Sequence, residues 1–295
     1  MFSRLVFLPL LLVAMALNAG ATTKQPKKII QPLDPPMTVV VVRSSIASCE
    51  PECPQWIAAE GRITAQTPAL FKKALNLAGN RRFPVIVTSP GGDVDAALAI
   101  GTMIRARKLD VAVGWTSFTG CAPRQNECKP SIYRGTVLTH GSYCVSACPL
   151  ILAAGQQRLL GPGAVIGVHQ ISTTMIQDRL LYRERYVVVN GKKKVISRTL
   201  VSRKPSRSYV TTKLDTSHRR KLAAYLKTMG VGEELIGLFN KAPPSSIYVL
   251  QPNEAVSAKI VTAFSPAANL VGTYLCAAPT PPDNCVKLEL PASKL

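Results

Sequence analysis

A serine between two cysteines is the first group in this sequence whose type and setting could do covalent chemistry. Residues 141–155, GSYCVSACPLILAAG, place Ser146 at the start of an apolar run that predicts a short helix. At such a junction the free N–H groups and the helix dipole would favour an alkoxide or an oxyanion. Serine is also a common helix N-cap. This stretch alone therefore leaves both roles open for Ser146.

A histidine at the end of a strand could serve such a serine as a base. Residues 163–170, GAVIGVHQ, form an apolar run that ends in His169. A neutral imidazole is the side chain best suited to accept a hydroxyl proton near neutral pH. A lone histidine of this kind could equally be a hydrogen-bonded core residue. His140 and His218 are expected to be structural or surface residues.

A glycine pair completes the set of chemically suggestive features. Residues 89–94, SPGGDV, follow an apolar run that predicts a strand. Two glycines at the carboxyl end of a parallel strand let the backbone approach a ligand closely and direct its N–H groups at it. Pro-Gly-Gly is also an ordinary turn, so this motif is weak evidence by itself.

The eight cysteines fall into four near-neighbour pairs, and in an oxidising compartment such a pattern indicates disulfides. None of the spacings is the two-residue knuckle of structural zinc sites, and no histidine lies at a matching offset. We therefore expect disulfides and neither a metal ion nor another cofactor. The candidate cysteines are Cys49, Cys53, Cys121, Cys128, Cys144, Cys148, Cys276 and Cys285.

The N-terminus has the pattern of a secretory signal. A charged start, an apolar run over residues 5–17 and the small residues 19–21 predict a signal peptide over residues 1–21, cleaved near Ala21. A Pro- and Lys-rich linker over residues 22–36 follows. The protein is thus expected to be periplasmic or secreted, which agrees with the use of cysteine.

The charge of the chain is strongly positive and uneven. The formal net charge is +20, and more than half of it lies between Arg179 and Lys221. Such a block could attract an anionic envelope surface, or it could be a solvated hairpin. Nucleic acid is not an expected partner, because the chain is predicted to be exported and contains no nucleic-acid-binding motif.

Strands and helices alternate along the first part of the chain, which predicts an α/β fold with right-handed βαβ units and a mostly parallel sheet. Insertions are expected near 115–135 and at 177–213. The second contains an alternating pattern over 185–204 around Asn190-Gly191, a strong hairpin signal. We expect strands over 37–42, 56–64, 83–92, 110–114 and 136–140, and helices over 67–80, 93–108, 217–229 and 232–241.

Three motifs in order, SPGGDVDAALAIGTMI, CVSACPLILAAG and RLLGPGAVIGVHQ, resemble those of the Clp protease proteolytic subunit and the wider ClpP/crotonase superfamily. The secreted form with cysteines around the serine is similar to predicted periplasmic ClpP-like proteins. The resemblance implies a ClpP-like domain over 37–264 with a ClpP/crotonase βαβ superhelix, and a Pro-rich, cysteine-bearing tail over 265–295. It implies Ser146 as nucleophile, His169 as general base, and the N–H groups of Gly92 and Ala147 as the oxyanion hole.

The third member of the implied triad departs from the family pattern. The orienting aspartate should fall between about 240 and 246, where the sequence reads NKAPPSS and has no acid. Ser246 or Asn240 could hold the imidazole instead, and Asp215 could reach in from elsewhere. Loss of the carboxylate lowers the rate of a serine protease by about 10⁴-fold.

Together these features predict an exported serine hydrolase of peptidase type that acts on a peptide or other acyl carbonyl. The alternative is a catalytically weak or inactive binding protein of the envelope, which uses the basic hairpin to bind anionic partners. A crotonase-type acyl-CoA enzyme fits poorly with export. The resemblance also implies a homo-oligomer, and no ATPase partner is expected outside the cytoplasm.

Overall fold

The structure of the protein, a computed structural model, describes residues 34–288. The signal peptide expected over 1–21 lies outside the described residues, as do residues 22–33 of the expected linker and residues 289–295. No helix within the described part of the chain is long and apolar enough to cross a membrane. Export and self-association remain predictions.

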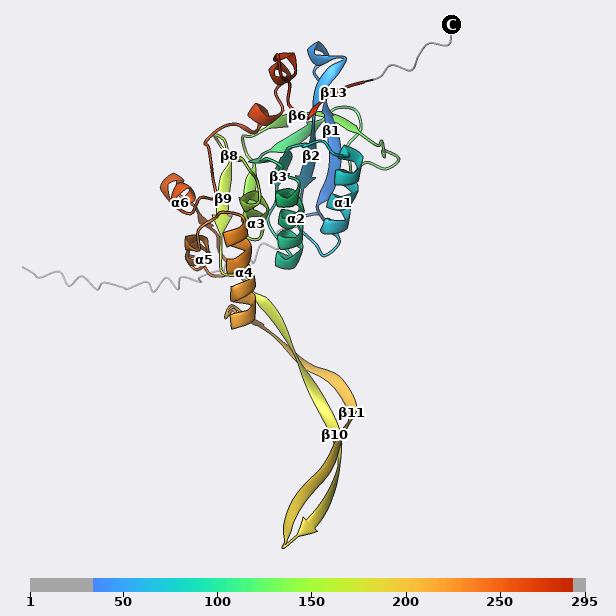
Figure 1. The fold of residues 1–295 in the computed structure, drawn as a ribbon, viewed down its shortest axis with the longest axis vertical. Coiled ribbons are helices and arrows are strands. Elements are labelled where there is room, and N and C mark those ends of the chain that lie inside the picture. Colours follow the sequence, from blue (N-terminus) through green and yellow to red (C-terminus); the bar gives the residue numbers. More distant parts are fainter. Residues whose placement is uncertain (1–33, 289–295) are drawn as a thin grey trace, which may run out of the picture. The chain divides into compact units, whose positions relative to one another are not determined.

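A largely parallel sheet forms the centre of the fold (Figure 1). Its order is β5-β6-β1-β2-β3-β4-β8, with β13 paired to β2. The run β2-β3-β4-β8 and the pair β1-β6 are parallel, whereas β1-β2, β5-β6 and β2-β13 are antiparallel. The predicted α/β class with a mostly parallel sheet is therefore confirmed. The strands are β1 (Thr38–Ser44), β2 (Glu52–Glu60), β3 (Val85–Thr88), β4 (Val111–Val113), β5 (Trp115–Phe118), β6 (Tyr133–Leu138), β8 (Arg158–Leu160) and β13 (Cys285–Lys287).

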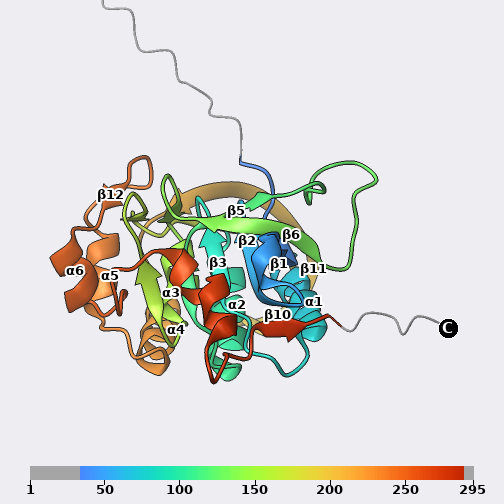
Figure 2. The same ribbon diagram turned by 90° about the horizontal axis from the view of Figure 1, so that it is seen from above.

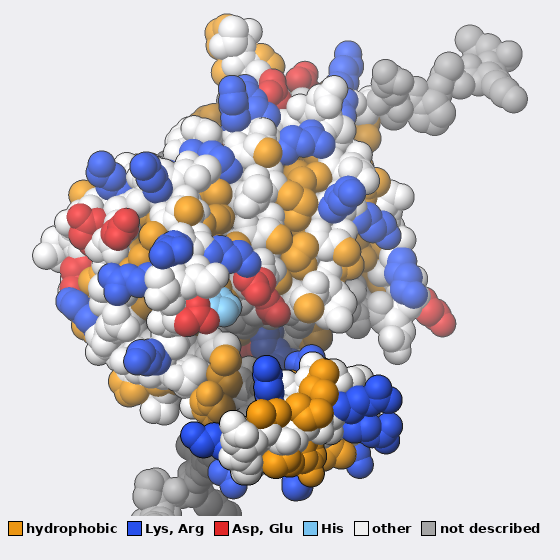
Figure 3. All heavy atoms as spheres, turned by 60° about the horizontal axis from the view of Figure 1, so that its bottom comes forward, with side chains coloured by type: hydrophobic (Ala, Val, Ile, Leu, Met, Phe, Trp, Pro, Cys, Tyr) orange, Lys and Arg blue, Asp and Glu red, His pale blue; other side chains and the backbone are white. Residues whose placement is uncertain are grey.

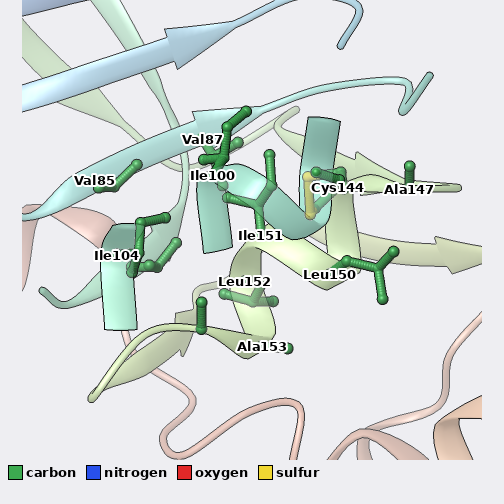
Figure 4. Close-up of a cluster of buried hydrophobic side chains, with 14 of the residues drawn as sticks. Val85, Val87, Ile100, Ile104, Cys144, Ala147, Leu150, Ile151, Leu152 and Ala153 are labelled. Carbon is green, nitrogen blue, oxygen red and sulfur yellow. A yellow bond between two sulfur atoms is a disulfide. The ribbon is translucent and has the colours of Figure 1, made fainter. Parts of the chain in front are cut away.

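Both faces of the sheet are covered, which explains why its strands are apolar at consecutive positions. In β3, Val85 and Val87 belong to one buried cluster, and Ile86 belongs to another on the opposite face. The first cluster contains the buried sides of α1 (Thr67–Ala78), α2 (Val94–Ala106) and α3 (Cys148–Ala153). Figure 4 shows its part around β3, α2 and α3.

The C-terminal segment packs on the other face. Ala267, in the short 3-10 helix Ala267–Leu270, is fully buried with Trp56 and Ile86. Strand β13 then adds residues 285–287 to the sheet. The segment expected as a tail over 265–295 is thus, as far as residue 288, part of the same folded unit.

A second, three-stranded sheet has the order β12-β9-β7. It consists of β7 (Tyr143–Val145), β9 (Val165–Val168) and β12 (Tyr248–Val249). Strands β7 and β9 are parallel neighbours. Helices α4 (Thr216–Thr228), α5 (Glu234–Phe239) and α6 (Pro252–Ser257) gather on the side of the body away from α1 (Figure 2).

The insertion after His169 forms one long antiparallel hairpin. Its strands are β10 (Thr173–Val189) and β11 (Lys192–Thr211), joined at Asn190-Gly191, whose positive φ angles of 52° and 74° suit a two-residue hairpin turn. The hairpin is longer than the 185–204 that the sequence pattern predicts. Three register irregularities interrupt the alternation of apolar and polar residues, so the sequence pattern predicts only part of the hairpin.

All four cysteine pairs are disulfides in the structure, each joining nearest neighbours in the sequence. The short 3-10 helix Ala47–Cys49 ends at the first of them. The loop between β5 and β6 contains the second, and the 3-10 helix Thr273–Ala277 contains the first cysteine of the fourth. The bonds are Cys49–Cys53, Cys121–Cys128, Cys144–Cys148 and Cys276–Cys285.

Candidate active site

The parallel pair β7 and β9 brings Ser146 and His169 to the same edge of the small sheet. Val145, the last residue of β7, pairs with Gly167, two residues before His169. The N–H of Ser146 donates to the carbonyl oxygen of Gly167 at 2.9 Å. Because parallel strands end at the same edge, residues that are more than twenty positions apart in the chain meet there.

The turn after β3 forms the other side of this site. Ser89 accepts a backbone hydrogen bond from Val145 at 3.0 Å, and its own N–H donates to Tyr143 at 2.8 Å. These bonds place Gly91 directly against Ser146. A Cβ atom on Gly91 would lie 2.5 Å from the Cβ of Ser146, and Gly91 has a φ of 93°. This position therefore requires glycine.

Ser146 has an unusual backbone and is not a helix cap. Its φ is 61°, in the left-handed region that non-glycine residues rarely adopt. The N-cap of α3 is Ala147, and no side chain caps that helix end. The buried disulfide Cys144–Cys148 spans Ser146 (Figure 4). Strained backbone of this kind persists only where surrounding structure holds it, and here that structure is a disulfide and two strands.

All four residues of the expected catalytic set line one pocket. Its volume is about 50 Å³, and it contains Gly92, Ser146, Ala147 and His169. No hydrogen-bond partner for the N–H of Gly92 or of Ala147 is present among residues 34–288. Two residues with unbonded N–H groups, a serine and a histidine thus line the same small space, and no hydrogen bond joins the side chains of Ser146 and His169 among residues 34–288. The rest of the lining is Val94, Leu150, Ile171, Ser172 and Phe239.

The imidazole of His169 is oriented by the backbone. Its Nδ1 lies 2.9 Å from the carbonyl oxygen of Gln170. A carbonyl can only accept, so Nδ1 carries the proton and Nε2 is left as the acceptor. The N–H of Gln170 donates to the carbonyl oxygen of Ala242 at 2.9 Å, which ties the segment to the loop after α5.

The expected side-chain candidates for the third member are engaged elsewhere or exposed. The amide of Asn240 donates to the carbonyl oxygen of Ile236 at 3.2 Å, within its own helix end. Ser246 is exposed, and its N–H donates to Pro243. Asp215 caps α4 and accepts from Nδ1 of His218 at 2.8 Å, and these bonds hold its pKa below its usual value. Within the described structure, none of the three is hydrogen-bonded to His169.

A larger pocket of about 300 Å³ adjoins the first and shares four lining residues with it, among them Gly92 and Ile171. Its walls are apolar and polar side chains of α2, α4 and the root of the hairpin, including Asp95, His218 and Lys221. At its edge Asp95 and Lys221 form an ion pair at 2.6 Å. The apolar lining consists of Val94, Leu98, Ile171, Leu214 and Leu222.

The sequence did not predict two contributions to the site, the carbonyl of Gln170 and the packing of Gly91 on Ser146. Gln170 acts through its carbonyl oxygen, which leaves no trace in the sequence. Gly91, the first glycine of the pair, is set against Ser146 by the bridge between Ser89 and Cys144. Only the Pro-Gly-Gly motif could have indicated it. Among the described residues there is no cluster of three or more His, Cys, Asp or Glu side chains placed to hold a metal ion.

The sequence matches no protein-family profile and no curated protein. Solved structures similar to this one include an S97A mutant of the 1510-N membrane-bound stomatin-specific protease, at 17% identity and a TM-score of 0.40, covering 72% of this chain and 79% of that one. ClpP1 of Listeria monocytogenes is similar at 15% identity and a TM-score of 0.40, covering 70% and 89%. The ClpP catalytic domain of Plasmodium falciparum is similar at 16% identity and a TM-score of 0.37, covering 70% and 83%.

Proposed function

We propose that the protein is a serine hydrolase of peptidase type that acts on a peptide or other acyl carbonyl. One observation carries this proposal: one pocket is lined by a serine on strained backbone, by a histidine whose Nδ1 is bonded to a carbonyl, and by two residues whose N–H groups have no hydrogen-bond partner within the described structure. These are the groups that acyl transfer needs, namely a nucleophile, a base and donors for the oxyanion.

In the proposed reaction the Oγ of Ser146 attacks the carbonyl carbon and gives its proton to Nε2 of His169. The N–H groups of Gly92 and Ala147 donate to the oxyanion, and each such donor contributes roughly 3 kcal/mol. The imidazolium then gives the proton to the leaving amine or alcohol, and the acyl group stays on Ser146. Water, deprotonated by His169, releases the acid in the reverse sequence.

We expect the proposed hydrolysis to be slow because the hydrogen-bond partner of His169 is a neutral carbonyl group. The carbonyl of Gln170 fixes the tautomer but carries no full charge to stabilise the imidazolium. In serine proteases loss of the carboxylate lowers kcat by about 10⁴-fold. We therefore expect slow turnover, with acylation of Ser146 easier to detect than hydrolysis.

The neighbouring pocket of about 300 Å³ would hold a substrate side chain next to the scissile bond. Its lining combines apolar side chains with charged and hydroxyl-bearing ones, so we propose that it takes a side chain with an apolar body and a polar end. The ion pair between Asp95 and Lys221 lies at its edge, where the polar end of that side chain could contact it.

The test is covalent labelling with a fluorophosphonate probe, in which Oγ of the serine bonds to phosphorus and fluoride leaves. We expect Ser146→Ala to abolish labelling and His169→Gln to slow it at least about 100-fold. Ser172→Ala is the matched control, because Ser172 is the other serine that lines this pocket. Equal labelling of the Ser146→Ala variant and the unmodified protein would remove Ser146 from the mechanism.

A second candidate is a binding protein of this fold that has weak or no catalysis. It is favoured by the exposed basic hairpin, and by the lack of a carboxylate hydrogen-bonded to His169 among the described residues. This candidate predicts no labelling of Ser146 by any fluorophosphonate, together with binding to an anionic partner that Ser146→Ala leaves unchanged.

A further inference from the structure

The hairpin β10–β11 sorts its charges between its two faces. Successive side chains of a strand point to opposite faces, and residues paired across the ribbon share a face. Both acidic residues of the hairpin, Asp178 and Glu184, are even-numbered positions of β10, so they lie on the same face. We call this the paired face, and the face of the odd-numbered β10 residues the basic face.

On the paired face the positive charges are matched. Arg203 forms an ion pair with Asp178. Nε of Arg198 and Nζ of Lys193 each lie 3.3 Å from a carboxylate oxygen of Glu184. The same Arg198 also stacks over the ring of Tyr182 at 4.0 Å. The three basic side chains of this face therefore already have partners within the hairpin.

On the basic face the positive charges are unmatched. Seven basic residues lie there by position or by pairing, all exposed, and no acidic residue shares the face. None of the seven forms an ion pair with any residue between 34 and 288. They are Arg179, Arg183, Arg185, Lys192, Lys194, Lys204 and Arg207.

Apolar side chains lie between these cations. Leu181, Val187 and Val189 are on the basic face and are 60%, 42% and 52% exposed. Figure 3, which brings the hairpin toward the viewer, shows hydrophobic and basic side chains next to each other on it. A two-stranded ribbon with such side chains in water on both faces is marginally stable by itself, which favours a bound partner.

We propose that the basic face of the hairpin docks on a lipid bilayer that contains acidic phospholipids. Phosphate groups would pair with the cations, and the exposed leucine and valines would enter the boundary between headgroups and acyl chains. A soluble polyanion would use the cations but not the apolar side chains. A second copy of the same face would be repelled, because it carries the same unmatched charge.

Docking of the hairpin would also affect the two pockets of the candidate active site. The hairpin starts beside Ser172, which lines the Ser146 pocket, and ends before Leu214, which lines the adjoining pocket. The root of the docking element is therefore part of the wall of both pockets. The docking proposal does not depend on whether Ser146 reacts, since it rests on the hairpin alone.

The test is flotation of the protein with vesicles, with two variants that remove the same charge from opposite faces. Arg179→Gln/Arg183→Gln/Arg185→Gln neutralises the basic face, and Lys193→Gln/Arg198→Gln/Arg203→Gln neutralises the paired face. Against vesicles of phosphatidylcholine with phosphatidylglycerol, we expect the first variant to lose about 100-fold in affinity. The second should lose at most about tenfold, because its charges face away. Vesicles of phosphatidylcholine alone should not bind.

A third variant separates lipid from a soluble polyanion. Leu181→Ser/Val187→Ser/Val189→Ser keeps every charge and should lose at least about tenfold in affinity for the acidic vesicles, with unchanged affinity for polyphosphate. Equal losses in the two charge variants would overturn the assignment of the face. Full vesicle binding by the Leu181→Ser/Val187→Ser/Val189→Ser variant would overturn the bilayer and leave a soluble polyanion as the partner. Circular dichroism and thermal melting check that each variant retains its folded hairpin.

Discussion

Nδ1 of His169 lies 2.9 Å from the carbonyl oxygen of Gln170, the residue that follows it in the chain. The base of the proposed pair is thus oriented by a backbone group and not by a side chain. The bond selects the tautomer with the proton on Nδ1, which is the one a general base needs. The carbonyl group supplies no full negative charge to stabilise the imidazolium.

Side chains near residues 240–246 should be dispensable for reactivity. We expect Asn240→Ala and Ser246→Ala each to keep the fluorophosphonate labelling rate within about threefold, because neither side chain bonds to His169 in the described structure, whereas loss of a true triad member lowers the rate about 10⁴-fold. Asp215→Asn should behave in the same way, since Asp215 bonds to His218. A loss of 100-fold or more in any of the three would identify it as the third member and refute the backbone assignment.

Gly91 should tolerate no side chain. In Gly91→Ala the new Cβ would lie 2.5 Å from the Cβ of Ser146 and 2.8 Å from the N of Ala147, at a φ of 93°. We expect a loss of about 2 kcal/mol or more in the free energy of unfolding, together with loss of labelling at Ser146. Urea denaturation and probe labelling measure the two effects.

Gly237→Ala is the matched control for this substitution. Gly237 lies in α5, and a Cβ there would meet no atom within 4 Å. Because alanine is favoured over glycine in helices by up to about 1 kcal/mol, this variant should be at least as stable as the unmodified protein and should label normally. Normal labelling of Gly91→Ala would show that the close packing of the glycine turn on Ser146 is not required.

The relation between sequence and structure differs between the two sides of the site. The strand before His169 could be predicted, because 163–168 is an apolar run. Strand β7 has only three residues and lies next to the helical run, so its parallel pairing with β9 was not visible. The proximity of Ser146 to His169 therefore came from the family resemblance of the motifs. The carbonyl of Gln170 could not be predicted at all, since every residue has one.

The elements of the fold, too, could be predicted from the sequence only in part. Long periodic segments such as α1 and α2 were predicted within a few residues, because amphipathic periodicity and Pro or Gly at the ends mark them. Strands β5, β8 and β12 have two to four residues and carry too short a pattern. In the hairpin, the irregularities on β11 disturb the alternation, so only the half nearest the turn was predicted.

The disulfide Cys144–Cys148 should hold Ser146 in its reactive geometry. Replacing both cysteines by alanine is expected to lower the free energy of unfolding by about 2 kcal/mol and to slow labelling at least about tenfold, because the left-handed backbone of Ser146 is then less constrained. The control is Cys276→Ala/Cys285→Ala, which opens a disulfide at β13 whose two cysteines line neither pocket of the site. That variant should lose stability but keep its labelling rate. Equal labelling rates in the two double variants would remove the disulfide from the site.

The carboxyl of Glu60 should lower the free energy of unfolding as the pH rises and the group loses its proton. Burial raises the pKa of this carboxyl above its ordinary value, although the N–H of Thr116 donates to it at 2.6 Å. With a folded pKa above the unfolded one, the folded state binds the proton more tightly. The free energy of unfolding therefore falls as the pH rises from the unfolded pKa through the folded one, and the deficit is complete above it. We expect Glu60→Gln to be more stable than the unmodified protein at pH 7, and the difference to vanish at a pH below both values.

For Glu50 the expected change of stability with pH is opposite to that for Glu60. Hydrogen bonds from Arg43 and Arg134 lower the pKa of Glu50, so this carboxylate stabilises the fold above its unfolded pKa and loses that effect as the pH falls through the folded one. Glu50→Gln should therefore be less stable than the unmodified protein at pH 7, since it also leaves the buried Arg43 without its ion-pair partner. Urea denaturation across the acid range measures both variants. If Glu60→Gln proved less stable than the unmodified protein at pH 7, the hydrogen bond from Thr116 would outweigh the burial of the charge, and the carboxylate of Glu60 would be stabilising.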